Sequence, residues 1–143
     1  MKTNVYGALM ILALAMIVSA APLAQAQART KASVPFDFNL EQKSMPAGVY
    51  EISSLSNKVL VVRNLDTRDA RLLIESMAVQ ASEASGIPQA KLVFHKCGGE
   101  YFLSEIWNGQ SHTGIAFPES KREKELQLAS DSHQPELVVI AMK

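Results

Sequence analysis

Two neighbouring glycines, Gly98 and Gly99, separate two apolar segments and place the strongest constraint on how this chain can fold. Glycine takes the positive φ angles that a two-residue type I′ turn requires at both central positions. We therefore expect residues 91–97 and 100–108 to form a β-hairpin whose register is fixed by the turn. The expected cross-strand pairs are Cys97 with Glu100, Lys96 with Tyr101, His95 with Phe102, Phe94 with Leu103 and Leu92 with Glu105.

Both faces of this expected hairpin are largely apolar, because side chains alternate between the two faces of a strand. One face is expected to carry Leu92, Phe94, Tyr101, Leu103 and Trp107. The other is expected to carry Val93, His95, Cys97, Phe102 and Ile106. A hairpin that is apolar on both faces belongs at the centre of a sheet or in the wall of a small barrel.

The N-terminal half also predicts strands. Residues 34–40 alternate between apolar and polar side chains, and Pro35 predicts that this strand lies at a sheet edge or that its backbone nitrogen at this point faces outward. A turn over 45–48 leads into a second strand over 49–52, so the two are expected to form a hairpin. Residues 59–62 are apolar without alternation, as in a central strand.

The segment that follows predicts a turn, a longer strand and a loop. The turn covers 64–69, and the strand covers 70–79 with Leu73, Met77 and Val79 on one face. The loop covers 80–89.

Near the C-terminus one short helix is expected. Ser120 and Glu123 have the spacing of a capping box, and Pro118 precedes them. A short strand over 113–117 comes before this helix, and a last buried strand over 137–140 comes after it. Together the patterns predict an all-β fold, a small antiparallel sandwich or barrel with one short helix near the C-terminus.

The first 26 residues have the features of an export signal. Lys2 supplies a positive charge, 5–18 is apolar, and Ala24-Gln25-Ala26 matches the small-x-small cleavage pattern. The apolar run is shorter than the roughly 20 residues that span a bilayer, so we expect cleavage after Ala26 and no stable membrane insertion afterwards. The mature protein would be a single β-rich domain over 27–143, periplasmic or secreted.

Charge and cysteine content limit the partners. Without the signal the chain carries 13 basic and 14 acidic side chains, and this near balance argues against nucleic acid as a partner. Cys97 is the only cysteine, so the fold has no internal disulfide, and the thiol is either buried or able to form a disulfide dimer.

Several segments of the chain resemble a group of small exported β-rich proteins of soil bacteria, of the acidobacterial type. The resemblance rests on residues 34–38, 45–50, 91–95, 98, 101–103, 106–107 and 118–126. It implies a signal peptide and a compact β-rich domain, and it supplies no catalytic residues. Cys97 stands where the pattern of the group has an aromatic residue.

Three kinds of candidate site deserve comparison. His95, Cys97 and Glu100 are zinc-ligand types near the hairpin turn, but their spacing matches no zinc signature. Ser111-His112 and Ser132-His133 are adjacent pairs without the orienting acid that nucleophilic catalysis needs. Aromatic side chains could line a ligand pocket or fill the core; they are Tyr50, Tyr101, Phe102 and Trp107.

We therefore predict no catalytic, cofactor or metal site, and a non-enzymatic function. The expected role is an envelope-associated interaction or binding module for a protein partner, with its surface on the loops over 64–69, 80–89 and 108–112. Two alternatives remain: a carrier of a small apolar ligand, and a hydrolase whose site the sequence does not reveal.

Overall fold

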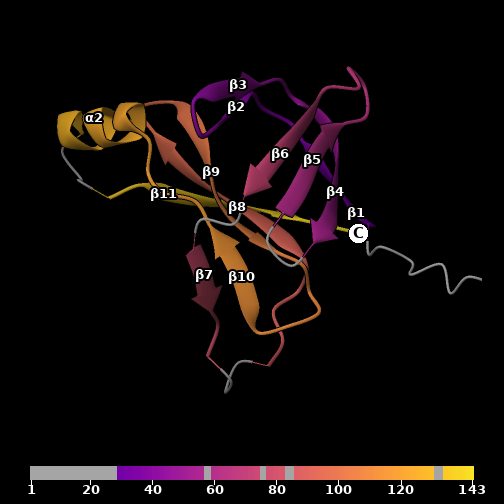
Figure 1. The fold of residues 1–143 in the computed structure, drawn as a ribbon. Helices are drawn as coiled ribbons and strands as arrows, with labels where there is room; N and C mark the ends of the chain where they lie inside the picture. Colours follow the sequence, from indigo (N-terminus) through magenta and orange to yellow (C-terminus); the bar gives the residue numbers. More distant parts are fainter. Residues whose placement is uncertain (1–28, 57–58, 75–76, 83–85, 131–133) are drawn as a thin grey trace, which may run out of the picture.

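The computed structural model describes residues 29–143 apart from 57–58, 75–76, 83–85 and 131–133. This part of the chain forms two β-sheets in a sandwich-like arrangement that does not close into a barrel, with one short helix near the C-terminus (Figure 1). The predicted all-β class is confirmed. The predicted signal peptide and its cleavage site after Ala26 lie outside the described residues.

The first sheet contains four antiparallel strands in the order β1-β4-β5-β6. Their bounds are β1 Arg29–Val34, β4 Gly48–Ser56, β5 Val59–Asn64 and β6 Ala70–Ile74. The predicted central strand over 59–62 is β5, which lies between β4 and β6. Strand β6 is the last in this order, so it forms one edge of the sheet.

The second sheet has the order β11-β8-β9-β10-β7. Strand β2 pairs in parallel with β9 and antiparallel with β3. The bounds are β2 Phe38–Leu40, β3 Lys43–Met45, β7 Met77–Gln80, β8 Lys91–Cys97, β9 Glu100–Trp107, β10 Thr113–Ala116 and β11 Glu136–Ala141. The helix is α2, Lys121–Ala129.

The single strand expected over 34–40 is wrong, because the chain divides there into β1 and β2, which belong to different sheets. The break falls at Pro35, which has no amide hydrogen to continue a ladder. The Asp37 carboxylate holds the bend by accepting a hydrogen bond from the Ala47 amide at 2.7 Å. The expected pairing with the following strand survives in β1 and β4, and the β2–β3 hairpin is inserted between them.

The longer strand expected over 70–79 is also wrong. It is two strands, β6 and β7, which belong to different sheets. Leu73 is buried, whereas Met77 is 55% exposed, so these two side chains do not share one buried face. The alternation rule applies along one continuous strand, and the change of sheet between Ile74 and Met77 interrupts it.

The β8–β9 hairpin has the expected turn, with φ angles of 55° at Gly98 and 86° at Gly99. The four cross-strand pairs nearest the turn are confirmed. Beyond them Ser104 is an extra residue in β9, a β-bulge, so Leu92 lies opposite Ile106 instead of Glu105. The sequence gives no local signal for this bulge.

The bulge exchanges the predicted faces of Ile106 and Trp107. Ile106 belongs to the hydrophobic core between the sheets, together with Leu92, whereas Trp107 lies outside that cluster. A Cβ atom on Gly114 would lie 2.6 Å from the indole of Trp107, so only glycine leaves room for this ring. The core takes side chains from both sheets, among them Val34, Phe38, Met45, Tyr50, Val62, Leu73, Phe94 and Leu103.

Strand β11 is an edge strand and is only half buried, contrary to the prediction of a buried last strand. Leu137 is 63% exposed and Val139 is 53% exposed. After β11 the C-terminal residue Lys143 exchanges two backbone hydrogen bonds with Lys31 of β1, at 2.8 and 2.9 Å. This pair connects the edges of the two sheets.

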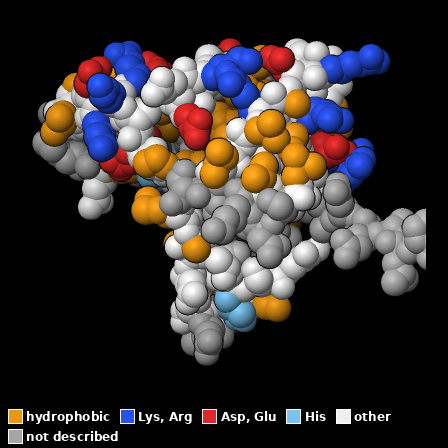
Figure 2. All heavy atoms as spheres, viewed as in Figure 1, with side chains coloured by type: hydrophobic (Ala, Val, Ile, Leu, Met, Phe, Trp, Pro, Cys, Tyr) orange, Lys and Arg blue, Asp and Glu red, His pale blue; other side chains and the backbone are white. Residues whose placement is uncertain are grey.

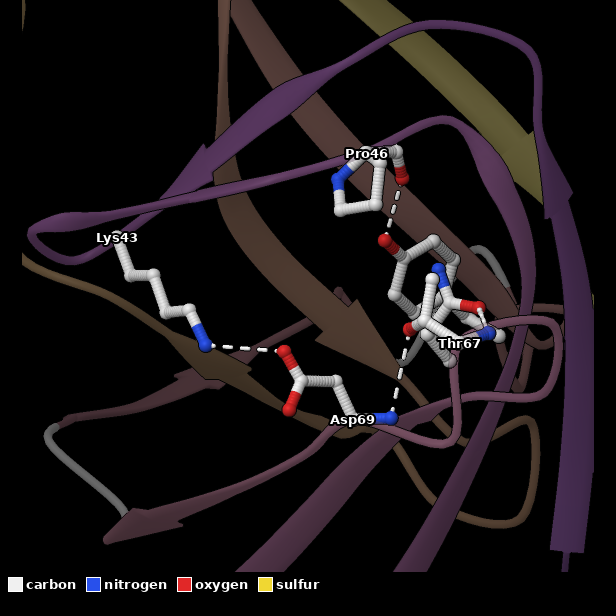
Figure 3. Close-up of polar contacts among 6 residues, drawn as sticks. Lys43, Pro46, Thr67 and Asp69 are labelled. Carbon is white, nitrogen blue, oxygen red and sulfur yellow. Dashed lines mark hydrogen bonds and ion pairs between the residues drawn. The ribbon is translucent and has the colours of Figure 1, made fainter.

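The predicted turn over 64–69 is organised by Asn64, which is fully buried. Its side-chain oxygen accepts hydrogen bonds from the amides of Asp66 at 2.8 Å and Thr67 at 3.0 Å. Figure 3 shows Thr67 of this loop and the Lys43–Asp69 ion pair. The Tyr50 hydroxyl donates a hydrogen bond to the Pro46 carbonyl. The loop thereby connects β5 and β6 to the β2–β3 hairpin.

We expect Asn64→Ala to lower the free energy of unfolding by roughly 1–3 kcal/mol, because two amides would lose their acceptor in a buried site. Asn108→Ala is the matched control, since Asn108 makes the same kind of bond to the Gln110 amide on an exposed turn. Urea denaturation of both variants measures the difference. Equal losses in the two variants would contradict the role assigned to Asn64.

Replacing both turn glycines by valine should destabilise the fold by about 1–2 kcal/mol per residue, because β-branched residues disfavour positive φ. The Gly98→Asn, Gly99→Asn double variant should lose less, since asparagine tolerates this conformation. Thermal unfolding compares the two. A valine variant as stable as the wild-type protein would show that the turn does not need positive φ.

Candidate functional site

A cluster of polar and ionisable side chains lies where α2 meets β8 and β9. The helix begins as predicted at Ser120, whose hydroxyl accepts a hydrogen bond from the Glu123 amide at 3.1 Å. This bond satisfies one of the free amides of the first helical turn. Figure 1 shows α2 beside the turn end of the β8–β9 hairpin, where Leu126 is the side chain nearest to Gly98.

The helix presents a carboxylate to the protein interior. Glu123 is only 4% exposed and is the single buried residue of α2, whereas Leu128 is 75% exposed. A buried carboxylate is costly unless it is hydrogen-bonded or paired with a cation. The position of α2 therefore depends on the partner of Glu123.

That partner is His95 of β8. The distance between His95 Nδ1 and Glu123 Oε1 is 2.6 Å, and the distance between His95 Nε2 and the Ser104 hydroxyl oxygen is 3.0 Å. Ser104 is the extra residue of the β9 bulge. The three side chains form one continuous hydrogen-bonded chain from the helix to the sheet.

The environment of His95 favours its charged form. The hydrogen bond to Glu123 raises the pKa of His95 above its ordinary value of 6.5, partly opposed by burial of the imidazole. The negative charges of Glu123 and Glu119 act in the same direction as the hydrogen bond. The imidazole is therefore held as a cation to a higher pH than in an unfolded chain.

Glu119 completes the cluster. One ligand atom from each of His95, Glu119 and Glu123 lies within 4.8 Å of the others. Glu119 is exposed and precedes the helix, and its carboxylate accepts a hydrogen bond from the Gln127 side chain at 3.2 Å. Glu123 and Gln127 are four residues apart and so lie on one side of the helix, and the bond from Gln127 holds the Glu119 carboxylate beside that side.

The metal trio weighed from the sequence does not form. Of its members only His95 belongs to the cluster of metal-ligand types found among the described residues. Glu100 instead accepts two hydrogen bonds from the Arg122 guanidinium, at 3.1 and 2.7 Å. Cys97 is 5% exposed, and burial raises the pKa of its thiol. A disulfide dimer through Cys97 remains a prediction, and the thiol would first have to become accessible.

The serine–histidine pairs weighed from the sequence gain no support. Ser111 donates its hydroxyl hydrogen bond to the carbonyl of Thr113 at 3.0 Å, within its own loop. Ser132-His133 lies outside the described residues. The pair that the fold does assemble, Ser104 with His95, is nine residues apart in the sequence and adjacent only because of strand pairing.

The structure also has an open groove with a volume of about 1150 Å³. One wall is Arg71, Leu72 and Leu73 of β6, the second is the β2–β3 hairpin over 39–43, and the third is the segment 118–122 before and at the start of α2. Of the four aromatic residues considered from the sequence only Phe102 lines it; Tyr50 is in the core.

The chain from Ser104 through His95 to Glu123 has the connectivity of a catalytic triad, in which an acid orients a base and the base contacts a hydroxyl. Neither Ser104 nor His95 lines the groove, however, so a substrate held there would not meet the hydroxyl. The arrangement is better suited to hold a positive charge, either a proton on His95 or a bound cation.

Sequence reasoning identified His95 and identified Glu123 only as a helix-start residue. It missed Ser104 and Glu119. The four-residue spacing of Glu119 and Glu123 at the start of the predicted helix was a usable signal, whereas their proximity to His95 arises from tertiary packing alone.

Searches with this chain found no matching protein-family model, no matching curated protein and no matching solved structure. Within the described residues no helix is both long enough and apolar enough to cross a membrane.

The His95–Glu123 pair should make stability depend on pH in chelator-treated protein. Because folding raises the pKa of His95, its contribution is complete below the unfolded pKa of about 6.5 and is lost as pH rises through the folded pKa. The free energy of unfolding should therefore fall as the pH rises from the unfolded pKa to the folded pKa of His95. Glu123→Gln should flatten this fall, and Glu125→Gln, on the exposed side of α2, should not. Urea titrations at a series of pH values test it, and a fall that persists unchanged in Glu123→Gln would assign it to another group.

Proposed function

We propose that this protein is a non-catalytic binding module that takes an extended, acidic segment of a partner protein into the groove beside β6. The supporting observation is that the groove has the edge of a sheet as one of its walls. An exposed sheet edge can accept a further strand through backbone hydrogen bonds, a common mode of peptide recognition.

Strand β6 has few of the features that protect sheet edges from additional strands. Among the strands that the structure describes, β5 is its only neighbour. Natural edges are usually guarded by proline, bulges or several charged residues. Strand β6 has the sequence Ala-Arg-Leu-Leu-Ile, and its register with β5 is regular throughout.

The side chains of β6 offer different contacts on its two faces. Leu73 is buried in the core and Arg71 faces the same side, towards the groove. Leu72 is 65% exposed on the opposite face. Figure 2 shows apolar side chains gathered over β5 and β6. A strand added to β6 would cover part of this apolar surface, which stabilises the complex.

The charges of the groove favour an acidic segment. Its lining carries four basic side chains and two acidic ones. Lys43 is paired with Asp69 and Arg122 with Glu100, whereas Arg71, Lys121, Glu41 and Glu119 form no ion pair with any described residue, so the side chains of the lining itself sum to two positive charges. Figure 2 shows basic side chains over α2 and over the β2–β3 hairpin. Complementary charge increases both the association rate and the specificity.

Binding of two labelled peptides to the purified protein tests the proposal. One peptide alternates valine with glutamate and the other alternates valine with lysine, and fluorescence anisotropy measures each dissociation constant. The acidic peptide should bind more tightly, and its affinity should decrease with added salt. Equal affinity for both peptides, or no binding of either, would contradict the proposal.

Matched variants locate the site. Arg71→Glu should weaken binding of the acidic peptide at least about fivefold. Arg63→Glu, on the neighbouring strand outside the groove, should have little effect on its affinity. Leu72→Lys should weaken binding of both peptides more than Leu137→Lys does. Leu137 is the matched control because it is about equally exposed, on an edge of the other sheet. If the control variants lose as much affinity, the peptides bind elsewhere. A small apolar ligand found by native mass spectrometry would instead favour the carrier alternative.

A further inference from the structure

We propose that His95, Glu119 and Glu123 form a binding site for one divalent transition-metal ion, with Zn²⁺ as its representative. This site shares Glu119 with the lining of the groove, but neither proposal requires the other. The sequence predicted no metal site, and of the trio that was weighed only His95 is retained.

The donor set fits such an ion. Imidazole nitrogen and carboxylate oxygen are ordinary zinc ligands, and three protein ligands leave a position for water. The three ligand atoms lie within 4.8 Å of one another. Tetrahedral zinc with bonds near 2.1 Å requires donor atoms about 3.4 Å apart. The His95–Glu123 contact of 2.6 Å is therefore too narrow for the ion, and the Glu119 ligand atom lies within 4.8 Å of the other two, at most about 1.4 Å beyond the required spacing.

The flexibility of the ligands allows both adjustments. Glu119 is exposed and lies just outside the helix, so its side chain can move towards the other two. The contact between His95 and Glu123 is 2.6 Å, the distance of two groups that share a proton. A metal ion would replace that proton and increase the distance between the two atoms by less than 1 Å, from 2.6 Å to the required spacing of about 3.4 Å.

Ser104 supplies the second contact that metal-binding histidines usually have. Its hydroxyl lies 3.0 Å from His95 Nε2. When Nε2 carries the hydrogen and donates it to Ser104, the lone pair of Nδ1 is directed towards Glu123 and the cluster. Such an outer hydrogen bond fixes the tautomer and orientation of a ligating imidazole.

Charge balance favours a divalent ion over a proton. The two carboxylates carry two negative charges, and a protonated His95 neutralises only one. A divalent ion with neutral His95 neutralises both, and it does so beside Glu123, which is 4% exposed. The buried Glu123 thus keeps a positive partner in either state, and the gain from the ion lies in the charge that it supplies to Glu119.

The test is a Zn²⁺ titration of the purified, chelator-treated protein in competition with a chromogenic chelator. We expect one Zn²⁺ per chain and a rise in melting temperature on binding. Glu119→Gln should weaken binding at least about tenfold, because it removes a ligand. Glu119 is exposed and its side chain makes one hydrogen bond, to Gln127, so this variant should keep the fold.

Two controls separate this site from adventitious binding. Glu125→Gln removes an exposed carboxylate from the same helix, and Cys97→Ser removes the thiol; both should bind Zn²⁺ like the wild-type protein. The nitrogen resonances of His95 should show coordination through Nδ1. Equal Zn²⁺ affinity of wild-type protein and Glu119→Gln, loss of binding in Cys97→Ser, or coordination through Nε2 would overturn the proposal.

Discussion

The β-bulge at Ser104 is the constraint on which both the core and the candidate site depend. One extra residue in β9 brings Ile106 into the core opposite Leu92 and places Trp107 on the outer face against Gly114. The same residue directs its own hydroxyl to His95. Without the bulge the alternation of β9 would continue, and Ile106 and Trp107 would exchange faces. The bulge at Ser104 thus determines both the packing of β9 inside the sandwich and the polar contact with His95 outside it.

Helix α2 associates with the sheet mainly through polar contacts. Its buried residue is Glu123, and the exposed Leu128 shows that apolar burial does not orient it. Hydrophobic contact is non-directional, whereas the hydrogen bond between Glu123 and His95 fixes the position of the helix along the sheet and its rotation about its own axis. Leu126 adds an apolar contact at the end of the hairpin, where it approaches Gly98. The charge state of a few side chains therefore has an unusually direct effect on the position of α2.

Local signals in the sequence predicted local structure correctly. The glycine pair fixed the β8–β9 turn and its nearest pairs, and Ser120 marked the first residue before α2. Features that depend on distant parts of the chain were not predictable. The bulge at Ser104, the passage of β6 into a different sheet from β7, and the proximity of Glu123 to His95 are all decided by tertiary packing. Alternation describes one strand at a time and does not show where a strand leaves its sheet.

The groove and the polar cluster share the segment that leads into α2. Glu119 lines the groove and also lies among the ligand types around His95, and Arg122 lines the groove while pairing with Glu100 of β9. The negative charge of Glu119 opposes an acidic segment in the groove, and neutralising it at the cluster would remove that opposition. Occupation of one site must then alter affinity at the other by the same factor in both directions, since linkage between binding equilibria is reciprocal. The coupling requires no rearrangement of the sheets, because a single side chain contributes to the electrostatics of both places.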